Sequence, residues 1–305
     1  MADNVVRARR LQDEATAKLA GAKNPGFLRS LFSSSSAGAR AEEASELFAK
    51  AGGAYKLAKR YADAGSAYRS AAAAAEASPD ASYGAPRLYA DAAKAYKAAP
   101  DGRAAAVESL EDAVRLYTQA SSPNFSQCAR LVKDIAELHE AGGDAAAAEA
   151  AYARAADFYT GEDAKSSAAA CRAKVAGLAA GRGAYAEAAA TFEAVATEAL
   201  DSPLLKYGAR EHLLSAGLCV AAGGDVVASR RALDRFESLD ASLAGTREGR
   251  LLEGVVAATE AGDVDAFTSA CVEYDSVGKL DPARTALLLT IKKGMKSAVE
   301  DDLLG

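Results

Sequence analysis

The sequence lacks the features that mark β-rich and membrane-spanning proteins. Strand-type runs of Val, Ile and Thr that alternate with polar residues are absent, and no stretch approaches 18 consecutive strongly apolar residues. The first absence predicts an all-α fold, and the second predicts that no helix spans a membrane. The chain begins with Met-Ala-Asp-Asn rather than a charged and then apolar leader, so we expect a cytoplasmic protein.

Residue patterns for catalysis or metal binding are also scarce. His139 and His212 have no Cys or His neighbour at ligand spacing, and the GxxxxGK[ST] pattern of triphosphate-binding loops is absent. The cysteines stand 43, 48 and 52 residues apart, which excludes a compact zinc motif and is typical of buried thiols in helices; they are Cys128, Cys171, Cys219 and Cys271. We therefore interpret both histidines as structural, and we expect no enzyme activity, no metal and no cofactor.

The composition favours a helical protein that binds other proteins. Half of the 305 residues are apolar, and Ala makes up roughly a quarter, far above its common usage. Ala is the best helix former because it loses no side-chain entropy in a helix. The net charge is −6, so the global charge does not favour nucleic acid as a partner.

A repeat of about forty residues runs through most of the chain. Gly-rich or polar breaks are centred at residues 60, 101, 142, 182, 223 and 262, with gaps of 41, 41, 40, 41 and 39 residues. A repeat of this length predicts helical hairpins, each of which buries its apolar face only by stacking on its neighbours. Ten residues after three of the breaks stand large apolar residues that we expect to anchor each hairpin: Tyr152, Phe192 and Leu233. Such arrays usually hold other proteins.

The N-terminal region combines a helix with an unusual loop. Residues 5–22 predict a first amphipathic helix, with Val6, Leu11, Ala15 and Leu19 near helical spacing, and the run 23–26 breaks it. The loop that follows is flanked by Gly and Ser but carries four large apolar residues: Phe27, Leu28, Leu31 and Phe32. Either they fold onto the first hairpin as a hydrophobic staple, or they insert into a bilayer with Arg29 near the headgroups.

Basic residues recur along the repeats and suggest a second kind of contact. They are Lys94, Lys97, Arg103, Arg130, Lys133, Lys165, Arg172, Lys174, Lys206, Arg210 and Arg247. Each one alone is consistent with an ordinary solvated surface, whereas together they could line one face and attract an acidic partner. The C-terminus is acidic and ends in two leucines with no evident core to join: Glu300, Asp301, Asp302, Leu303 and Leu304.

Several motifs resemble one known family. The segment 201–207 reads DSPLLKY, and further matches in the same order include GFLRSLF at 26–32, YTGE at 159–162, EYDS at 273–276 and KLD at 279–281. Over nearly its whole length the chain resembles the soluble NSF attachment proteins of the alpha type. These are adaptors that attach the ATPase NSF to SNARE complexes.

The resemblance implies a fold and two protein partners. The implied fold is a right-handed superhelix of antiparallel α-hairpins, similar to tetratricopeptide repeats, over residues 1–214, with a membrane-contacting loop at 23–40. A C-terminal helical bundle and acidic tail then cover residues 215–305. The implied partners are SNARE complexes, which are syntaxin-type helical bundles, and NSF, with the protein peripheral on membranes during vesicle transport and membrane fusion.

The resemblance also assigns residues. The SNARE-facing cations of the family correspond to Lys97, Arg130, Lys174, Lys206 and Arg247. A family lysine four residues before Lys174 is Ala170 here, which weakens the basic face unless Lys165 or Arg172 compensates. The leucine needed to stimulate NSF corresponds to Leu303. The family's usual final basic residue is absent, so either Leu303 or Leu304 is the candidate contact, with the acidic residues 300–302 beside them.

Two other classes of protein remain as alternatives at this stage. A generic helical-repeat scaffold could bind some other helical partner, but it would need neither the apolar loop nor the leucine tail. An all-α repeat enzyme would need a metal or an Asp-rich constellation, and the sequence has neither.

Overall fold

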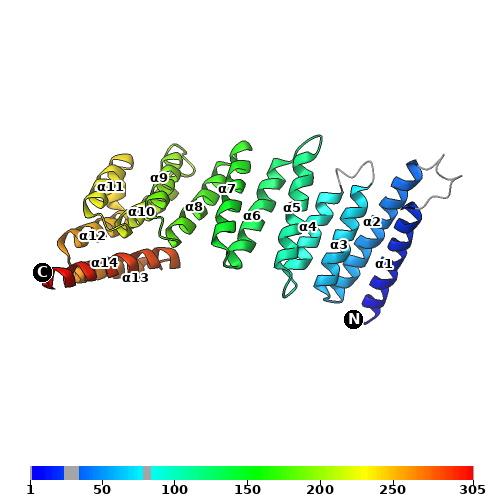
Figure 1. Ribbon diagram of the computed structural model, residues 1–305. Coiled ribbons are helices and arrows are strands. Elements are labelled where there is room, and N and C mark those ends of the chain that lie inside the picture. The colour runs from blue at the N-terminus through cyan, green and yellow to red at the C-terminus, as the bar shows by residue number, and fades with distance from the viewer. Residues whose placement is uncertain (1, 24–33, 78–83, 305) are drawn as a thin grey trace. The chain divides into compact units, whose positions relative to one another are not determined.

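The computed structural model describes residues 2–23, 34–77 and 84–304, and this part of the chain is helical without a strand (Figure 1). Contacts between Cα atoms divide the chain into an N-terminal unit, residues 1–163, and a C-terminal unit, residues 164–305. The predicted all-α class is confirmed. The domain boundary that we predicted between residues 214 and 215 falls inside helix α10 (Lys206–Ala222) and remains a prediction.

The N-terminal unit is a row of helices in which each one packs on the next along the chain (Figure 1). Its helices are α1 (Ala2–Lys23), α2 (Ser34–Leu57), α3 (Tyr61–Glu76), α4 (Ala85–Lys97), α5 (Arg103–Gln119), α6 (Phe125–Ala141) and α7 (Ala145–Gly161). Their direction alternates. The C-terminal ends of α1, α3 and α5 therefore lie on the same edge of the row as the N-terminal ends of α2, α4 and α6 (Figure 1). The tight turns lie on the opposite edge.

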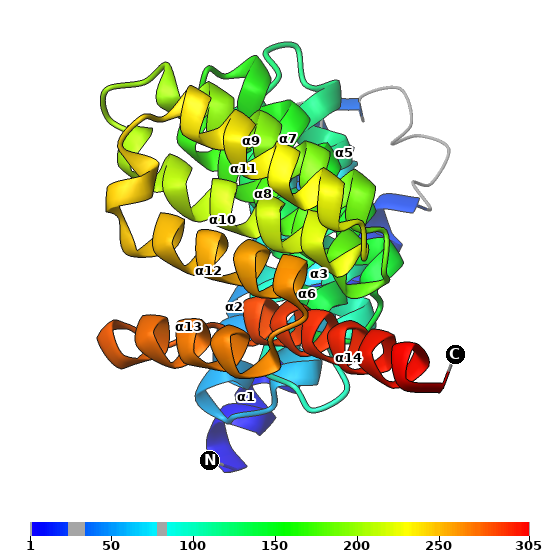
Figure 2. The same cartoon turned by 90° about the vertical axis from the view of Figure 1, so that its left-hand side faces the viewer.

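The C-terminal unit begins with further helical hairpins, and its last helix packs back on an earlier one. Its helices are α8 (Lys165–Gly181), α9 (Tyr185–Leu200), α10 (Lys206–Ala222), α11 (Val226–Leu239), a 3₁₀ turn η2 (Leu243–Gly245), α12 (Arg247–Ala261), α13 (Val264–Val277) and α14 (Pro282–Leu304). Figure 2 shows α13 and α14 side by side next to α12. Helix α14 also packs on α10, far back along the chain.

All six predicted breaks separate neighbouring helices. At three of them the chemistry of a Gly-Asp turn explains why. Gly143, Gly224 and Gly262 have φ values of +77°, +84° and +66°, the left-handed region that favours glycine at a helix end. The aspartate that follows caps the next helix: the carboxylate of Asp144 accepts a hydrogen bond from the Ala147 amide at 3.0 Å, and that of Asp225 accepts one from Ala228 at 2.8 Å. One short motif therefore ends one helix and begins the next.

The predicted anchors are buried, and one predicted contact of the first helix is wrong. Tyr152, Phe192 and Leu233 are all in the core. Ala15 of α1 is buried as expected, but Val6 is 68% exposed. Helix α1 begins the row and packs mainly on α2, so only one side of it is covered, and Val6 lies outside that side.

Long-range polar contacts hold α14 in place within the C-terminal unit. The Arg284 side chain donates from Nε to the Ser215 hydroxyl at 3.3 Å and from Nη2 to the Glu211 carbonyl at 3.2 Å. Lys292 donates to the Thr268 hydroxyl at 2.8 Å, which ties α14 to α13. These bonds add specificity to a core that runs from Ala176 to Met295.

Candidate functional site

The described residues contain no metal-binding cluster and no membrane-spanning helix. No group of three or more His, Cys, Asp or Glu side chains in that part could hold a metal ion. No described helix is long and apolar enough to cross a membrane. His212 stacks on Phe192 with ring centroids 6.4 Å apart, and burial lowers the pKa of its imidazole. His139 lies 3.9 Å from Asp144 in the α6–α7 turn, so both histidines have structural surroundings.

In the N-terminal unit, two predicted SNARE-facing cations lie close together. Lys97 ends α4 and Arg130 lies on α6, and both are exposed. Lys97 is 3.7 Å from the carboxylate of Asp134, which stands one helical turn beyond Arg130. Arg130 and Asp134 line a cavity of about 350 Å³ between α4, α5 and α6. The structure therefore brings these cations to one surface of the unit.

In the C-terminal unit, Lys174 is exposed on α8. Ala170 stands one turn earlier and is also exposed, so both positions lie on the same side of this helix. Arg172, which could compensate for Ala170, pairs with Glu198 at 2.6 Å. Its charge is therefore already neutralised by a neighbour.

The DSPLLKY segment forms the turn from α9 to α10 and exposes two large apolar side chains. Leu204 is 88% exposed and Tyr207 is 69% exposed. The Ser202 carbonyl accepts hydrogen bonds from the amides of Leu205 and Lys206 at 3.1 and 2.9 Å, which fixes the turn. The Lys206 ammonium lies 5.2 Å from the centre of the Tyr207 ring. We call Leu204, Lys206 and Tyr207 the turn patch.

The apolar half of the turn patch was not predicted from the sequence. Lys206 was assigned through the resemblance, whereas Leu204 and Tyr207 served there only as letters of a signature. Leu204 lies in the turn and Tyr207 in the first turn of α10, and both expose apolar area to solvent. A run of Pro-Leu-Leu directly after a helix end was the available signal.

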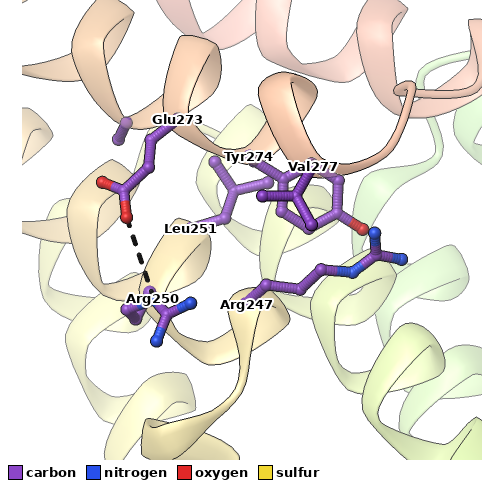
Figure 3. Close-up of a pocket in the computed structure, with 7 residues that line it drawn as sticks. Arg247, Arg250, Leu251, Glu273, Tyr274 and Val277 are labelled. Atoms are coloured by element: carbon purple, nitrogen blue, oxygen red, sulfur yellow. Dashed lines mark ion pairs between the residues drawn. The ribbon is translucent and has the colours of Figure 1, made fainter.

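Arg247 has contacts that join two helices of the C-terminal unit. Its guanidinium donates to the carboxylate of Glu248 at 2.6 Å and lies 5.0 Å from the centre of the Tyr274 ring (Figure 3). A Cβ atom at Gly278 would come within 2.3 Å of the same guanidinium, so this group lies close against the end of α13. Arg247 therefore connects α12 to the end of α13, and its SNARE contact remains a prediction.

The cavity beside Arg247 is too small for a ligand. Its volume is about 30 Å³, and its wall includes Arg250, whose guanidinium pairs with Glu273 at 3.9 Å (Figure 3). Ligand pockets usually measure about 300–1,000 Å³. This cavity is a packing feature of the C-terminal unit.

The EYDS and KLD motifs build the connection from α13 to α14. The Asp275 carboxylate accepts hydrogen bonds from the Leu280 amide at 2.9 Å and the Lys279 ammonium at 2.8 Å, and the bond from Lys279 is the main cause of its lowered pKa. Asp281 then caps α14 by accepting from the amides of Ala283 and Arg284, both at 2.9 Å. Both motifs are thus explained by local structure.

The predicted membrane and NSF contacts fall largely outside the description. The loop residues Phe27, Leu28, Leu31 and Phe32 lie outside the described residues. The backbone of residues 300–304 continues helix α14 as far as Leu304, where we expected a tail without regular contacts. The side chains of that segment are outside the description.

Comparisons with known proteins agree with these observations. The family model described as soluble NSF attachment protein matches residues 6–296. The alpha-soluble NSF attachment protein of Vitis vinifera is 41% identical over 181 residues, 59% of this chain and 63% of that protein. The protein of the same name from Mus musculus is 39% identical over 178 residues, 58% of this chain and 60% of that protein. The chain thus spans about six-tenths of the length of the curated relatives that it matches.

A solved structure supports the fold alone. A signal transduction ATPase with numerous domains and a tetratricopeptide repeat sensor, from Pyrococcus horikoshii, superposes with a TM-score of 0.50 at 14% identity. The superposition covers 95% of this chain and 46% of that one. Helical hairpins in series, their Gly-Asp turns and the match of the family model over residues 6–296 lead to one conclusion: this chain belongs to the family of soluble NSF attachment proteins.

Proposed function

We propose that this protein is an adaptor that binds SNARE complexes and recruits and stimulates the ATPase NSF, so that SNARE complexes are disassembled during vesicle transport. The match of the family model over residues 6–296 is the observation that carries this proposal. In this proposal the chemistry belongs to NSF, and the adaptor supplies surfaces.

The SNARE-binding surface would combine charge with a small apolar contact. A SNARE bundle is an acidic rod, so Lys97, Arg130, Lys174 and Lys206 would attract it over a distance that salt shortens. The turn patch adds apolar area beside Lys206, which charge alone does not provide. Full burial of one large apolar side chain contributes about 1.5–3 kcal/mol. We therefore expect Leu204 and Tyr207 to slow dissociation, and the cations to speed association.

The first experiment separates these contributions. Arg130→Glu with Lys206→Glu should clearly weaken binding to a recombinant SNARE bundle, and more at low salt than at high salt. Leu204→Ser with Tyr207→Ser should weaken binding at every salt concentration, because apolar contacts are not screened. A control with the same charge change at exposed positions, Lys56→Glu with Arg231→Glu, should bind like the unaltered protein. If binding is unchanged by the first two variants at low salt, the proposed surface is the wrong one.

A membrane contact through residues 27–32 forms a second part of the proposal. Phe27→Ser with Leu28→Ser should lower disassembly of membrane-anchored SNARE complexes far more than disassembly of soluble ones, since only the former places the loop beside a bilayer. Equal loss in both assays, or a lower melting temperature, would instead favour the hydrophobic staple.

The C-terminal leucines form the third part. Leu303→Ala with Leu304→Ala should leave SNARE binding intact and abolish ATP-driven disassembly by NSF, because the residues 300–304 would meet NSF and not the SNARE bundle. Full disassembly by this variant would remove the tail from the mechanism. It would also favour the alternative, a generic tetratricopeptide-like scaffold for another helical partner.

A further inference from the structure

The cavity between α4, α5 and α6 is lined by an unusual set of side chains. Its volume of about 350 Å³ lies within the range of ligand pockets. Polar and charged residues form much of the wall: Arg87, Lys94, Tyr117, Gln127, Arg130 and Asp134. The cavity opens to solvent, so a charged ligand can enter without being stripped of all its water.

Two arginines of this wall keep their charge available. Arg69, Arg115 and Arg154 of the same unit each pair with a carboxylate at 2.6 to 3.3 Å. By contrast, no described carboxylate forms an ion pair with Arg87 or Arg130, although the chain is acidic overall. Guanidinium groups bind phosphate with two parallel hydrogen bonds, so an unpaired pair of them facing one cavity suits a phosphate-bearing ligand.

The other charges around the cavity largely cancel. Lys94 lies 3.3 Å from Asp91, and Asp134 lies 3.7 Å from Lys97. Two positive charges, those of the arginines, therefore remain. The side chain of Lys94 is 72% exposed, so its pair with Asp91 is weak and the ammonium is free to turn towards a ligand.

Tyr117 adds a neutral donor to these cations. It is partly buried in the wall, and burial raises the pKa of its phenol, while the nearby charge of Arg87 opposes that rise. The phenol thus keeps its proton and can donate it in a hydrogen bond to a phosphate oxygen. Arginine, lysine and tyrosine from three helices therefore face one space.

The position of the cavity within the N-terminal unit indicates where the phosphate comes from. Arg87 stands near the start of α4, Tyr117 near the end of α5 and Arg130 in the first half of α6. These helix ends lie on the same edge of the row as the C-terminal end of α1, where the chain leads on to α2 (Figure 1). The connection from α1 to α2 carries the apolar residues for which we propose a membrane contact. A bilayer that touches this edge of the row would bring lipid headgroups towards the cavity.

We propose that this cavity binds the phosphorylated headgroup of an inositol lipid, as a second membrane contact beside the apolar loop. The choice of a lipid source rests on the proposed membrane contact, whereas the phosphate chemistry rests on the cavity alone. The contact would select membranes by headgroup, a property that apolar side chains cannot supply. Arg130 would serve both this cavity and the proposed SNARE surface, so the test uses other residues.

The test measures binding of the full chain to vesicles by flotation. Vesicles of phosphatidylcholine with phosphatidylinositol bisphosphate should bind more tightly than vesicles with phosphatidylserine at equal total charge. Arg87→Gln with Lys94→Gln should lower affinity for the inositol lipid by about tenfold or more, as expected for losing a charge-assisted hydrogen bond. A control variant, Lys56→Gln with Arg103→Gln, removes the same charge at the opposite edge of the row. It should bind like the unaltered protein.

Three outcomes would overturn the proposal. These are equal binding of both anionic vesicles, an unchanged affinity of the Arg87 and Lys94 variant, or binding of soluble inositol phosphates without binding of vesicles. Binding of the same variant to an unphosphorylated SNARE bundle in solution separates this inference from the proposed function. We expect that binding to fall far less than vesicle binding, since neither Arg87 nor Lys94 is among the five SNARE-facing cations that the resemblance assigns. Loss of SNARE binding with intact vesicle binding would assign the cavity to the SNARE surface and leave the adaptor role standing.

Discussion

The two units of the chain are built from the same kind of helical hairpin, but their cores differ. In the N-terminal unit, small clusters of Ala with one or two aromatic rings join three or four consecutive helices, as around Tyr55, Phe48 and Tyr89. In the C-terminal unit, one cluster extends from α8 to α14 and is rich in Leu as well as Ala. Stacking of neighbours is sufficient for the first core. The second core also requires a helix that returns from the end of the chain.

This difference predicts different responses to the same core mutation. Leu218 and Leu110 are both buried, one on α10 and the other on α5. Leu→Ala at either site should cost about 2–5 kcal/mol in the free energy of unfolding. After Leu218→Ala, hydrogen exchange should rise in all helices of the C-terminal unit together; after Leu110→Ala, it should rise mainly in α4, α5 and α6. An equally wide spread from both sites would abolish the distinction.

A pair of glycines tests how tightly each unit packs. A Cβ atom at Gly65 would stand 2.7 Å from the ring of Tyr96, whereas one at Gly177 would meet nothing within 4 Å. Gly65→Ala should therefore destabilise the protein, because overpacking costs about 1–3 kcal/mol and helix propensity returns less than about 1 kcal/mol. Gly177→Ala should stabilise it by about 0.5–1 kcal/mol. Urea denaturation measures both values, and a stabilising Gly65→Ala would contradict the close packing of α3 on α4.

Acidification should affect the C-terminal unit through His212. Burial holds the pKa of this imidazole below its ordinary value of 6.5, so the unfolded chain binds the proton more readily than the folded one. Stability should be complete above the unfolded pKa and fall as the pH drops below it, by at most about 1.4 kcal/mol per pH unit for one proton. His212→Phe keeps a ring against Phe192 and should remove this part of the pH dependence. An unchanged slope would assign the effect to other groups.

The smallest expected effect concerns the basic surface of α8 in the C-terminal unit. Ala170 leaves a gap one turn before Lys174 on α8. Ala170→Lys should raise affinity for a SNARE bundle by up to about fivefold, since an exposed pair contributes about 0.2–1 kcal/mol. Ala194→Lys, at an exposed position on α9, controls for net charge. An equal gain from both variants would mean that only total charge matters.

Local chemistry made much of the fold predictable. The breaks were visible because glycine and aspartate act within a few residues, and the anchors followed because helical register is also local. The packing of α14 on α10 was not predictable in the same way. Arg284 and Glu211 are 73 positions apart, and nothing in the surrounding sequence pairs them.

The same contrast between local sequence and long-range packing applies to the candidate site. Lys97 and Arg130 came from the resemblance, but the cavity that Arg130 lines depends on how α4, α5 and α6 pack. The exposure of Leu204 and Tyr207 was missed because exposure is a property of surroundings and not of a residue type. The internal contact of Arg247 with Tyr274 was missed because it joins two helices.

The buried thiol of Cys219 can report when the C-terminal unit opens. Burial within α10 raises the pKa of this thiol to about 12, so at neutral pH almost none of it is the reactive thiolate. An alkylating reagent can modify it only when α10 separates from its neighbours. The rate of labelling at Cys219, followed separately from the other three cysteines, therefore measures how often this unit opens. If engagement by NSF pulls on α14, that rate should rise while ATP is being consumed.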